Sequence, residues 1–328
     1  MTASGPVRTV VAVDLGGTGI KAARLDLHGR VEARRTVATP VAAGAGAVVS
    51  AVGEVARSLV VPGTVGVGLC APGVLDTAAG LVRYAPNLGM RDVALAAAVQ
   101  QHVGAPVVME HDVRAACLAE HRLGLGRGVD DLVVIALGTG VAAGVVTGGR
   151  LLTGAAGSAG ELGHVPVHVG GEPCPCGQRG CLEAYASAGG IVRRYRAAGG
   201  AADRTAADIA ASAFHEPVAA RIWQEGAQAL ARALVTTTMI LDPAVIALTG
   251  GLTGAGEHLL GPVRTALAAG LAWREPPRVA ISALGAEASL YGAALHFLET
   301  AGLHAVLTSW QAPTGDRGTA PTQEDDGC

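Results

Sequence analysis

The sequence lacks the features that mark a protein for a polyanionic partner. Lys21 is the only lysine, so 23 of the 24 basic residues are arginine, and the 27 acidic residues give a net charge of −3. Proteins that bind nucleic acid or an anionic membrane surface normally carry a basic patch or a basic excess. We therefore expect neither nucleic acid nor a membrane among the partners.

The N-terminal residues also lack the charged start and the apolar run of a secretory signal peptide. This absence predicts a cytoplasmic protein, and it makes disulfide bonds the weaker interpretation of the six cysteines. One uncharged stretch, residues 132–149, is 18 residues long, about the minimum for a transmembrane helix. Because it holds five glycines and two threonines, it favours strands around a turn instead.

Glycine-rich turns follow apolar strands at several places in the chain. Residues 9–14 are apolar and rich in β-branched side chains and residues 20–26 alternate, which predicts a hairpin. Its turn holds Gly16, Gly17 and Thr18. Glycines there let successive backbone N–H groups point at a phosphate, and Asp14 at the strand end could hold a magnesium ion. A plain hairpin turn is the alternative, because the turn is neither a Walker loop nor a dinucleotide-binding loop.

The same construction occurs a second time within residues 132–149, where a glycine turn again falls between two strands. This second turn holds Gly138, Thr139 and Gly140. A third turn, with Gly250 and Gly251, follows a predicted strand at residues 245–248 and precedes a helical stretch. A phosphate or an adenosine could rest on the N-terminus of that helix. Two phosphate-binding hairpins in successive domains would hold a nucleotide from both sides of a cleft.

Three cysteines, one histidine and two glutamates are interleaved within residues 157–183. The four soft ligands are His164, Cys174, Cys176 and Cys181. One imidazole with three thiolates is a closed tetrahedral set of the kind that binds structural zinc. We interpret the segment as a zinc knuckle that fixes Glu161 and Glu183 beside it. Cys70 and Cys117 have apolar neighbours in the sequence and are interpreted as buried small hydrophobic residues.

Asp112 stands where a predicted strand, residues 106–110, meets a predicted helix, residues 112–123. As a helix N-cap, its carboxylate would only need to accept hydrogen bonds from backbone N–H groups. At a strand end that faces a cleft, it could instead take a proton from a hydroxyl group. Taken alone, the position favours the N-cap interpretation, and the two roles can coexist.

The remainder of the chain alternates helices and strands, and its 328 residues are enough for about two α/β domains. Further helices are expected at residues 43–60, 92–102, 184–196, 217–241, 254–270 and 287–301, with a short helix within residues 199–216. Further strands are expected at residues 65–69 and 278–283. Residues 1–8 and the Pro-, Gly-, Thr- and acid-rich residues from about 308 onward are expected to be disordered.

Taken together, these motifs resemble the ROK family of sugar kinases, repressors and open reading frames, which has the actin/hexokinase/Hsp70 ATPase fold. The resemblance covers about residues 9–300. It rests on Asp14-Leu-Gly-Gly-Thr, Pro86-Asn87-Leu88, Asp112 with its helix, Leu137-Gly-Thr-Gly, Gly160-Glu-Leu-Gly-His164, Cys174-x-Cys-Gly-x-x-Gly-Cys-Leu-Glu183, Gly250-Gly251 and Gly285-Ala286. The glutamate, histidine and cysteine combination is more specific than the glycine turns.

The resemblance implies a two-lobed, actin-like (ribonuclease H-like) α/β fold, with a mixed sheet and helices in each lobe and the active-site cleft between the lobes. The small N-terminal lobe is expected at residues 9–120, and the large lobe with the zinc knuckle at residues 121–286. The closing helix, residues 287–301, would pack back on the first lobe, and residues 308–328 would form the disordered tail. Family members also suggest a homodimer.

In chemical terms the resemblance implies Mg²⁺- and ATP-dependent phosphorylation of a sugar hydroxyl, typically the 6-hydroxyl of a hexose such as glucose. Asp112 would be the general base, and Asp14 and the three glycine turns would bind the nucleotide. His164 would bind zinc through one ring nitrogen and the sugar through the other. The implied sugar contacts are Asn87, His111, Asp112, Glu161, His164 and Glu183. Positioning and charge neutralisation are the main requirements of phosphoryl transfer.

His111 departs from the family pattern, which usually has asparagine immediately before the catalytic aspartate. An imidazole is larger than an amide and forms different hydrogen bonds, so a modified sugar or a C7-cyclitol is the alternative to glucose as substrate. A sugar-responsive regulator is a further alternative. We rank it lower because only 13 residues precede Asp14, too few for a DNA-binding helix-turn-helix module.

Overall fold

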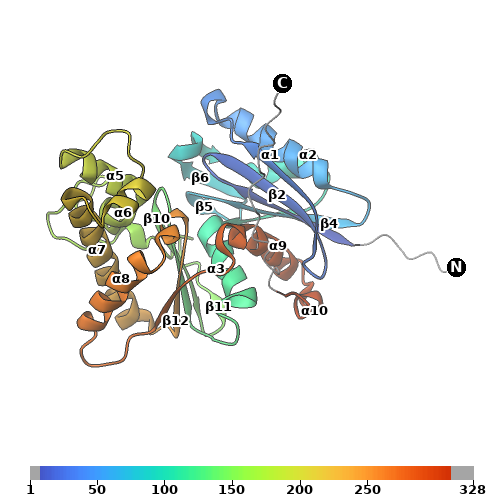
Figure 1. Ribbon diagram of the computed structural model, residues 1–328. Coiled ribbons are helices and arrows are strands. Elements are labelled where there is room, and N and C mark those ends of the chain that lie inside the picture. The colour runs from blue at the N-terminus through green and yellow to red at the C-terminus, as the bar shows by residue number, and fades with distance from the viewer. Residues whose placement is uncertain (1–7, 312–328) are drawn as a thin grey trace, which may run out of the picture.

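Two five-stranded sheets dominate the structure, a computed structural model that describes residues 8–311 (Figure 1). In the first sheet the strand order is β3-β2-β1-β4-β8. Its strands are β1 (Thr9–Leu15), β2 (Gly19–Asp26), β3 (Val31–Ala38), β4 (Thr64–Ala71) and β8 (Val107–His111). The first three form an antiparallel meander, whereas β1, β4 and β8 are parallel. The central strand β1 is apolar along nearly its whole length because helices cover both of its faces.

The second sheet repeats this plan, with the order β11-β10-β9-β12-β13. Its strands are β9 (Leu132–Leu137), β10 (Val141–Thr147), β11 (Arg150–Leu151), β12 (Val245–Thr249) and β13 (Arg278–Ile281). Here too a glycine hairpin, β9 to β10, is followed by two parallel strands. The prediction of strands around a turn at residues 132–149 is therefore confirmed, and the repeat seen in the glycine turns extends to the whole sheet.

Two helices lie between the sheets, α3 (Asp112–Leu123) and α9 (Ala288–Thr300) (Figure 1). They pack on each other, α9 covers β1 and β4 of the first sheet, and α3 also contacts β9 and β10 of the second. A Cβ atom at Gly144 of β10 would lie 2.4 Å from the Cβ of Cys117 on α3, so this close approach requires glycine. The other face of the first sheet is covered by α1 (Ala45–Leu59), which packs against α2 (Leu95–Val103).

The outer face of the second sheet is covered by a group of helices that contains the largest apolar core of the described residues. These are α4 (Leu182–Ala186), α5 (Ala188–Ala197), α6 (Ala206–Ser212), α7 (Pro217–Leu241) and α8 (Glu257–Gly270). Helix α7 begins at Pro217 as predicted, because proline is compatible with the first helical turn. It ends before Asp242, whose φ of 45° is left-handed. None of the helices in residues 8–311 has the length and apolar composition needed to cross a bilayer.

Several boundaries differ from the sequence prediction. A small sheet of β5 (Val74–Asp76), β6 (Leu81–Ala85) and β7 (Met90–Val93) was not predicted. The helix expected from Asp92 begins at Leu95 instead, because Asp92 belongs to β7 and has a φ of 51°. The helix expected over residues 184–196 is broken at Ser187, whose hydroxyl caps α5 by accepting a hydrogen bond from the Gly190 N–H.

Short 3-10 turns, strands β3 and β11, and the end of the chain account for further differences. The turns are η1 (Val41–Ala43), η2 (Pro86–Leu88), η3 (Leu162–His164), η4 (Gly251–Ala255) and η5 (Gly285–Glu287), and the four-residue helix α10 (His304–Leu307) follows α9. The helix expected from residue 254 thus begins at Glu257. The prediction of disorder from residue 308 is wrong at Trp310, which is buried and donates a hydrogen bond to the Leu27 carbonyl at 2.8 Å. Residues 1–7 and 312–328 lie outside the described residues.

Candidate active site and metal centre

Three acidic or thiol side chains form a row at the carboxyl ends of the parallel strands in the first sheet. The strand register pairs Asp14 of β1 with Cys70 of β4, and Cys70 with Glu110 of β8. The thiol of Cys70, which is fully buried as predicted, donates to Asp14 Oδ1 at 3.4 Å. Open α/β sheets bind ligands at the carboxyl ends of their strands. The row therefore places Asp14 where a ligand would bind.

The carboxyl group of Asp14 has a raised pKa. Burial, with a smaller contribution from the negative charge of Asp112, raises its pKa to about 6. The strand register places both carboxylates at the same end of the sheet, because Asp14 pairs with Cys70 and the next residue, Ala71, pairs with His111. A divalent cation bound beside the two carboxylates would offset their mutual repulsion, and oxygen ligands of this kind suit Mg²⁺.

Asp112 is the first residue of α3, and the prediction that it is the N-cap is wrong. The N-cap is His111, whose Nδ1 lies 3.3 Å from the Val113 N–H. Asp112 Oδ1 accepts from that same N–H at 2.7 Å and lies 3.1 Å from His111 Nδ1. These two contacts both fall on Oδ1, so Oδ2 is the oxygen of Asp112 left to meet a substrate.

Sequence reasoning missed a buried ion pair between Glu110 and Arg114, which flank His111 and Asp112 in the chain. Arg114 Nε donates to Glu110 Oε1 at 2.8 Å, and the two side chains are only 3% and 2% exposed. Glu110 Oε1 also accepts from the backbone N–H of His111 at 2.6 Å. Arg114 Nη1 donates to the carbonyl of Gly157 at 2.7 Å, in the loop that leads to Glu161. The four-residue spacing of Glu110 and Arg114 was the signal that could have revealed the pair.

The first glycine turn closes with a hydrogen bond from the Gly16 N–H to the Gly19 carbonyl at 2.9 Å. Gly17 and Thr18 at its tip are exposed. Asn87, on η2, stands beside the tip, since a Cβ atom at Gly17 would lie 3.8 Å from the Asn87 Cβ. The structure thus brings one predicted sugar contact next to the first predicted phosphate turn.

The second and third glycine turns lie against each other. In the second, the Gly138 N–H donates to the Gly140 carbonyl at 3.0 Å, and Thr139 at the tip is exposed. The third begins at Gly250, which has a φ of 94°; a Cβ atom there would lie 2.5 Å from the Leu137 carbonyl oxygen. Glycine is therefore required at Gly250, and the next residue, Gly251, begins η4.

Glu183, Glu161 and His164 are all held beside β10. Glu183 Oε2 accepts from the Val141 N–H at 3.0 Å, which places it directly after the second glycine turn. The segment before His164 docks on the free edge of β10, because the Ala143 N–H donates to the Gly160 carbonyl at 2.7 Å. Glu161 is exposed and immediately precedes η3, the 3-10 turn that ends at His164. Residues three apart share one side of a 3-10 turn.

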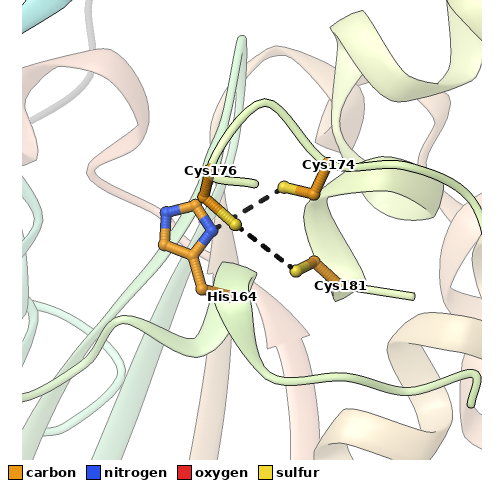
Figure 2. Close-up of side chains that lie close together, drawn as sticks. All are labelled: His164, Cys174, Cys176 and Cys181. Atoms are coloured by element: carbon orange, nitrogen blue, oxygen red, sulfur yellow. Dashed lines mark hydrogen bonds between the residues drawn. The ribbon is translucent and has the colours of Figure 1, made fainter. Parts of the chain in front are cut away.

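The four predicted metal ligands converge on one point (Figure 2). Their ligand atoms lie within 4.8 Å of one another. His164 Nδ1 is 3.9 Å from Cys174 Sγ, and Cys176 Sγ is 3.7 Å from Cys181 Sγ. Tetrahedral zinc with metal–sulfur bonds of about 2.3 Å separates its ligand atoms by about 3.8 Å. The cluster thus has the donor set and the spacing for zinc, and it leaves His164 Nε2 free of the cluster.

Comparison with known proteins identifies the family of the chain. The ROK family model matches residues 10–300. The chain is 36% identical to a glucokinase of Thermotoga maritima, over 79% of this chain and 87% of the relative. It is 35% identical to an N-acetylmannosamine kinase of Citrobacter koseri, over 88% of this chain and 98% of the relative.

A solved structure is also similar. The ROK family glucokinase from Streptomyces griseus, in complex with glucose and AMPPNP, is 34% identical and covers 88% of this chain and 98% of its own, with a TM-score of 0.77. The expected fold class, the two-lobed actin-like ATPase fold, is thereby confirmed. Because the family model spans nearly all of the described residues, the chain belongs to the ROK family.

Proposed function

We propose that the protein is an ATP-dependent sugar kinase that transfers the γ-phosphoryl group of ATP to the 6-hydroxyl of glucose. The observation that carries the proposal is the placement of Asp112. It stands at a strand end beside Asp14, with one carboxylate oxygen left for a substrate. The similarity to a glucokinase solved with glucose and AMPPNP supports the same reaction.

Asp112 acts as the general base. Its Oδ1 is held by the hydrogen bond from the Val113 N–H, so Oδ2 takes the proton of the sugar hydroxyl. As that proton leaves, the hydroxyl oxygen forms a bond to the γ-phosphorus, and the bond from this phosphorus to the bridging oxygen of ADP breaks. Backbone N–H groups of the glycine turns stabilise the charge on the phosphoryl oxygens.

The nucleotide lies between the glycine turns. The exposed tips at Gly17, Thr18 and Thr139 direct backbone N–H groups toward its phosphates, and the turn at Gly250 and Gly251 holds the adenosine end. Asp14 would hold Mg²⁺, which would supply positive charge beside the phosphates when bound. The lobes of residues 9–120 and 121–286 close around both substrates and exclude water.

The sugar is held by side chains from both lobes. Asn87, His111 and Asp112 contribute from the first, and Glu161, His164 and Glu183 from the second. Zinc would be bound by His164 Nδ1 and the three cysteines, which leaves no open position for substrate. Its role would therefore be structural, and His164 held in this way would present Nε2 to a sugar hydroxyl.

We also propose that the enzyme is a cytoplasmic homodimer. Met239 and Ile240, adjacent on α7, are 52% and 74% exposed, and apolar surface of this kind is common where protein subunits meet. Molar mass by light scattering would test the dimer, because a monomer at micromolar concentration contradicts it.

Release of ADP in the presence of Mg²⁺, ATP and a panel of acceptors tests the main proposal. The panel comprises glucose, mannose, N-acetylmannosamine, fructose, allose and a C7-cyclitol. We expect the highest kcat/KM with glucose. Absence of turnover with every acceptor, in zinc-replete protein, would exclude the kinase function, and a preference for the cyclitol would exclude glucose as the substrate.

A further inference from the structure

Glu120, near the end of α3, is a buried carboxylate with unusual partners. It is 0% exposed, and no salt bridge joins it to a cation within residues 8–311. Its partners are neutral donors. Oε2 accepts from the Leu125 N–H at 2.9 Å, while Oε1 accepts from the Ser282 hydroxyl and from the Leu284 N–H at 3.4 Å. A buried charge is costly unless it is fully hydrogen-bonded, so this arrangement needs an explanation.

The donors come from the two segments through which the chain passes between its sheets. Leu125 lies in residues 124–131, which connect α3 to β9, and Ser282 and Leu284 lie in the connection from β13 to α9. Each carboxylate oxygen thus holds one connection. Relative movement of the two sheets must bend these same segments.

Hydrogen bonds continue from Ser282 toward the third glycine turn. The Gly285 N–H donates to the Ser282 hydroxyl at 3.0 Å, and the Thr249 hydroxyl donates to the Gly285 carbonyl at 3.5 Å. Thr249 is the residue immediately before Gly250. The path therefore ends where the adenosine end of the nucleotide is placed by the proposed function.

We propose that Glu120 is a positioning residue that fixes both interlobe connections and so sets the distance between the bound nucleotide and Asp112. Asp112 begins the same rigid helix, about 12 Å away at 1.5 Å per residue. This inference rests on the proposed kinase function. A carboxylate is required because both of its oxygens accept. Glutamine would turn an NH₂ group toward the donors of one connection, whichever way its amide is oriented.

The test uses Glu120→Gln and Ser282→Ala in the full-length protein, with Glu299→Gln as the matched control. Glu299 is a 23% exposed carboxylate on α9 that pairs with Arg122 of α3, so it joins the same two helices without touching the connections. Two quantities are measured. They are the hydrogen-exchange rates of the Leu125 and Leu284 amides in the ligand-free protein, and the steady-state KM for ATP, KM for sugar and kcat.

For Glu120→Gln we expect exchange about tenfold faster at Leu125 or Leu284, the effect of losing one hydrogen bond to a charged group. We expect the KM for ATP to rise about fivefold or more, with a smaller change in the KM for sugar, because the path from Ser282 leads to the nucleotide turn. Ser282→Ala should shift both quantities in the same direction by less, and Glu299→Gln should shift neither. If Glu120→Gln does not fold, Ser282→Ala decides the question.

Unchanged exchange in both variants would overturn the role of Glu120 in holding the connections. Faster exchange with an unchanged KM for ATP would overturn its role in positioning the nucleotide. A wild-type protein that phosphorylates no sugar would instead refute the proposed function, while the exchange rates would still report on Glu120.

Discussion

Arg114 Nη1 donates a hydrogen bond to the carbonyl oxygen of Gly157 at 2.7 Å and so joins the start of α3 to the loop that leads to Glu161. The Arg114 guanidinium also donates to the Glu110 carboxylate, which accepts a second hydrogen bond from the backbone N–H of His111. One buried ion pair therefore supports the proposed base on one side and a proposed sugar contact on the other.

Replacing Arg114 with methionine should remove the connection between the start of α3 and the loop that leads to Glu161. The change leaves Glu110 buried without its cation, so we expect a loss of about 3–5 kcal/mol in the free energy of unfolding. Because the Gly157 loop also loses its anchor, the KM for sugar should rise more than the KM for ATP. Urea unfolding and steady-state kinetics measure both effects.

The control is the double variant Glu110→Gln with Arg114→Met, which removes both charges. It should regain most of the lost stability, since no unpaired buried charge remains, but it should keep the raised KM for sugar. If Arg114→Met unfolds at the wild-type urea concentration, or if the double variant restores the KM, the support attributed to this pair is wrong.

Acid should weaken nucleotide binding through Asp14. Its pKa of about 6 means that a proton competes with Mg²⁺ below that pH. We therefore expect the kcat/KM for MgATP to fall as the pH drops through about 6, and excess Mg²⁺ to restore part of it. Mg²⁺ titrations at several pH values measure this, and a kcat/KM independent of pH between 7 and about 5 would contradict it.

The same group has a predictable effect on stability. Its folded pKa of about 6 exceeds the ordinary value of 3.8, so the native state binds this proton more tightly than the unfolded state does. Its contribution to stability is therefore largest below pH 3.8 and decreases as the pH rises through about 6. In Asp14→Asn this pH-dependent contribution should vanish. Unfolding free energies of the wild type and the variant, compared between pH 3.8 and about 6, would show the difference.

Removal of zinc should weaken sugar binding more than it weakens nucleotide binding. The cluster orients His164 and the segment around Glu161 and Glu183, whereas the first glycine turn lies in the other lobe. We expect one zinc per chain by elemental analysis, and a raised KM for sugar or unfolding of residues 160–183 after chelation. Cys176→Ser should behave in the same way, and His168→Gln, a change in the same segment outside the cluster, should not. A metal-free, folded protein with full activity would contradict this role.

The sequence predicted features whose cause is local. Glycine turns after apolar strands, the helix that begins at Asp112 and the helix that begins at Pro217 were all found where expected, because each depends on neighbouring residues. The convergence of His164 with its three cysteines was predictable because the ligand types and their short spacing are visible in one segment.

Features that depend on distant partners were not predicted. The row of Asp14, Cys70 and Glu110 follows from the register of three parallel strands, which no local pattern encodes. The hydrogen bond from Arg114 to Gly157 joins residues 43 apart in the chain. Asp112 was interpreted as an N-cap because aspartate is common there, but His111 takes that position in the structure.

The central claim is that Asp112 removes the proton from the sugar hydroxyl, and Asp112→Asn tests it most directly. An amide at this position keeps the size of the side chain and its contacts but cannot accept the proton. With glucose and MgATP under saturating conditions, we predict that kcat falls by about 10²–10⁴-fold. Calorimetry should show glucose affinity within about threefold of wild type, a difference of less than 1 kcal/mol. A kcat that matches the wild type would contradict the account.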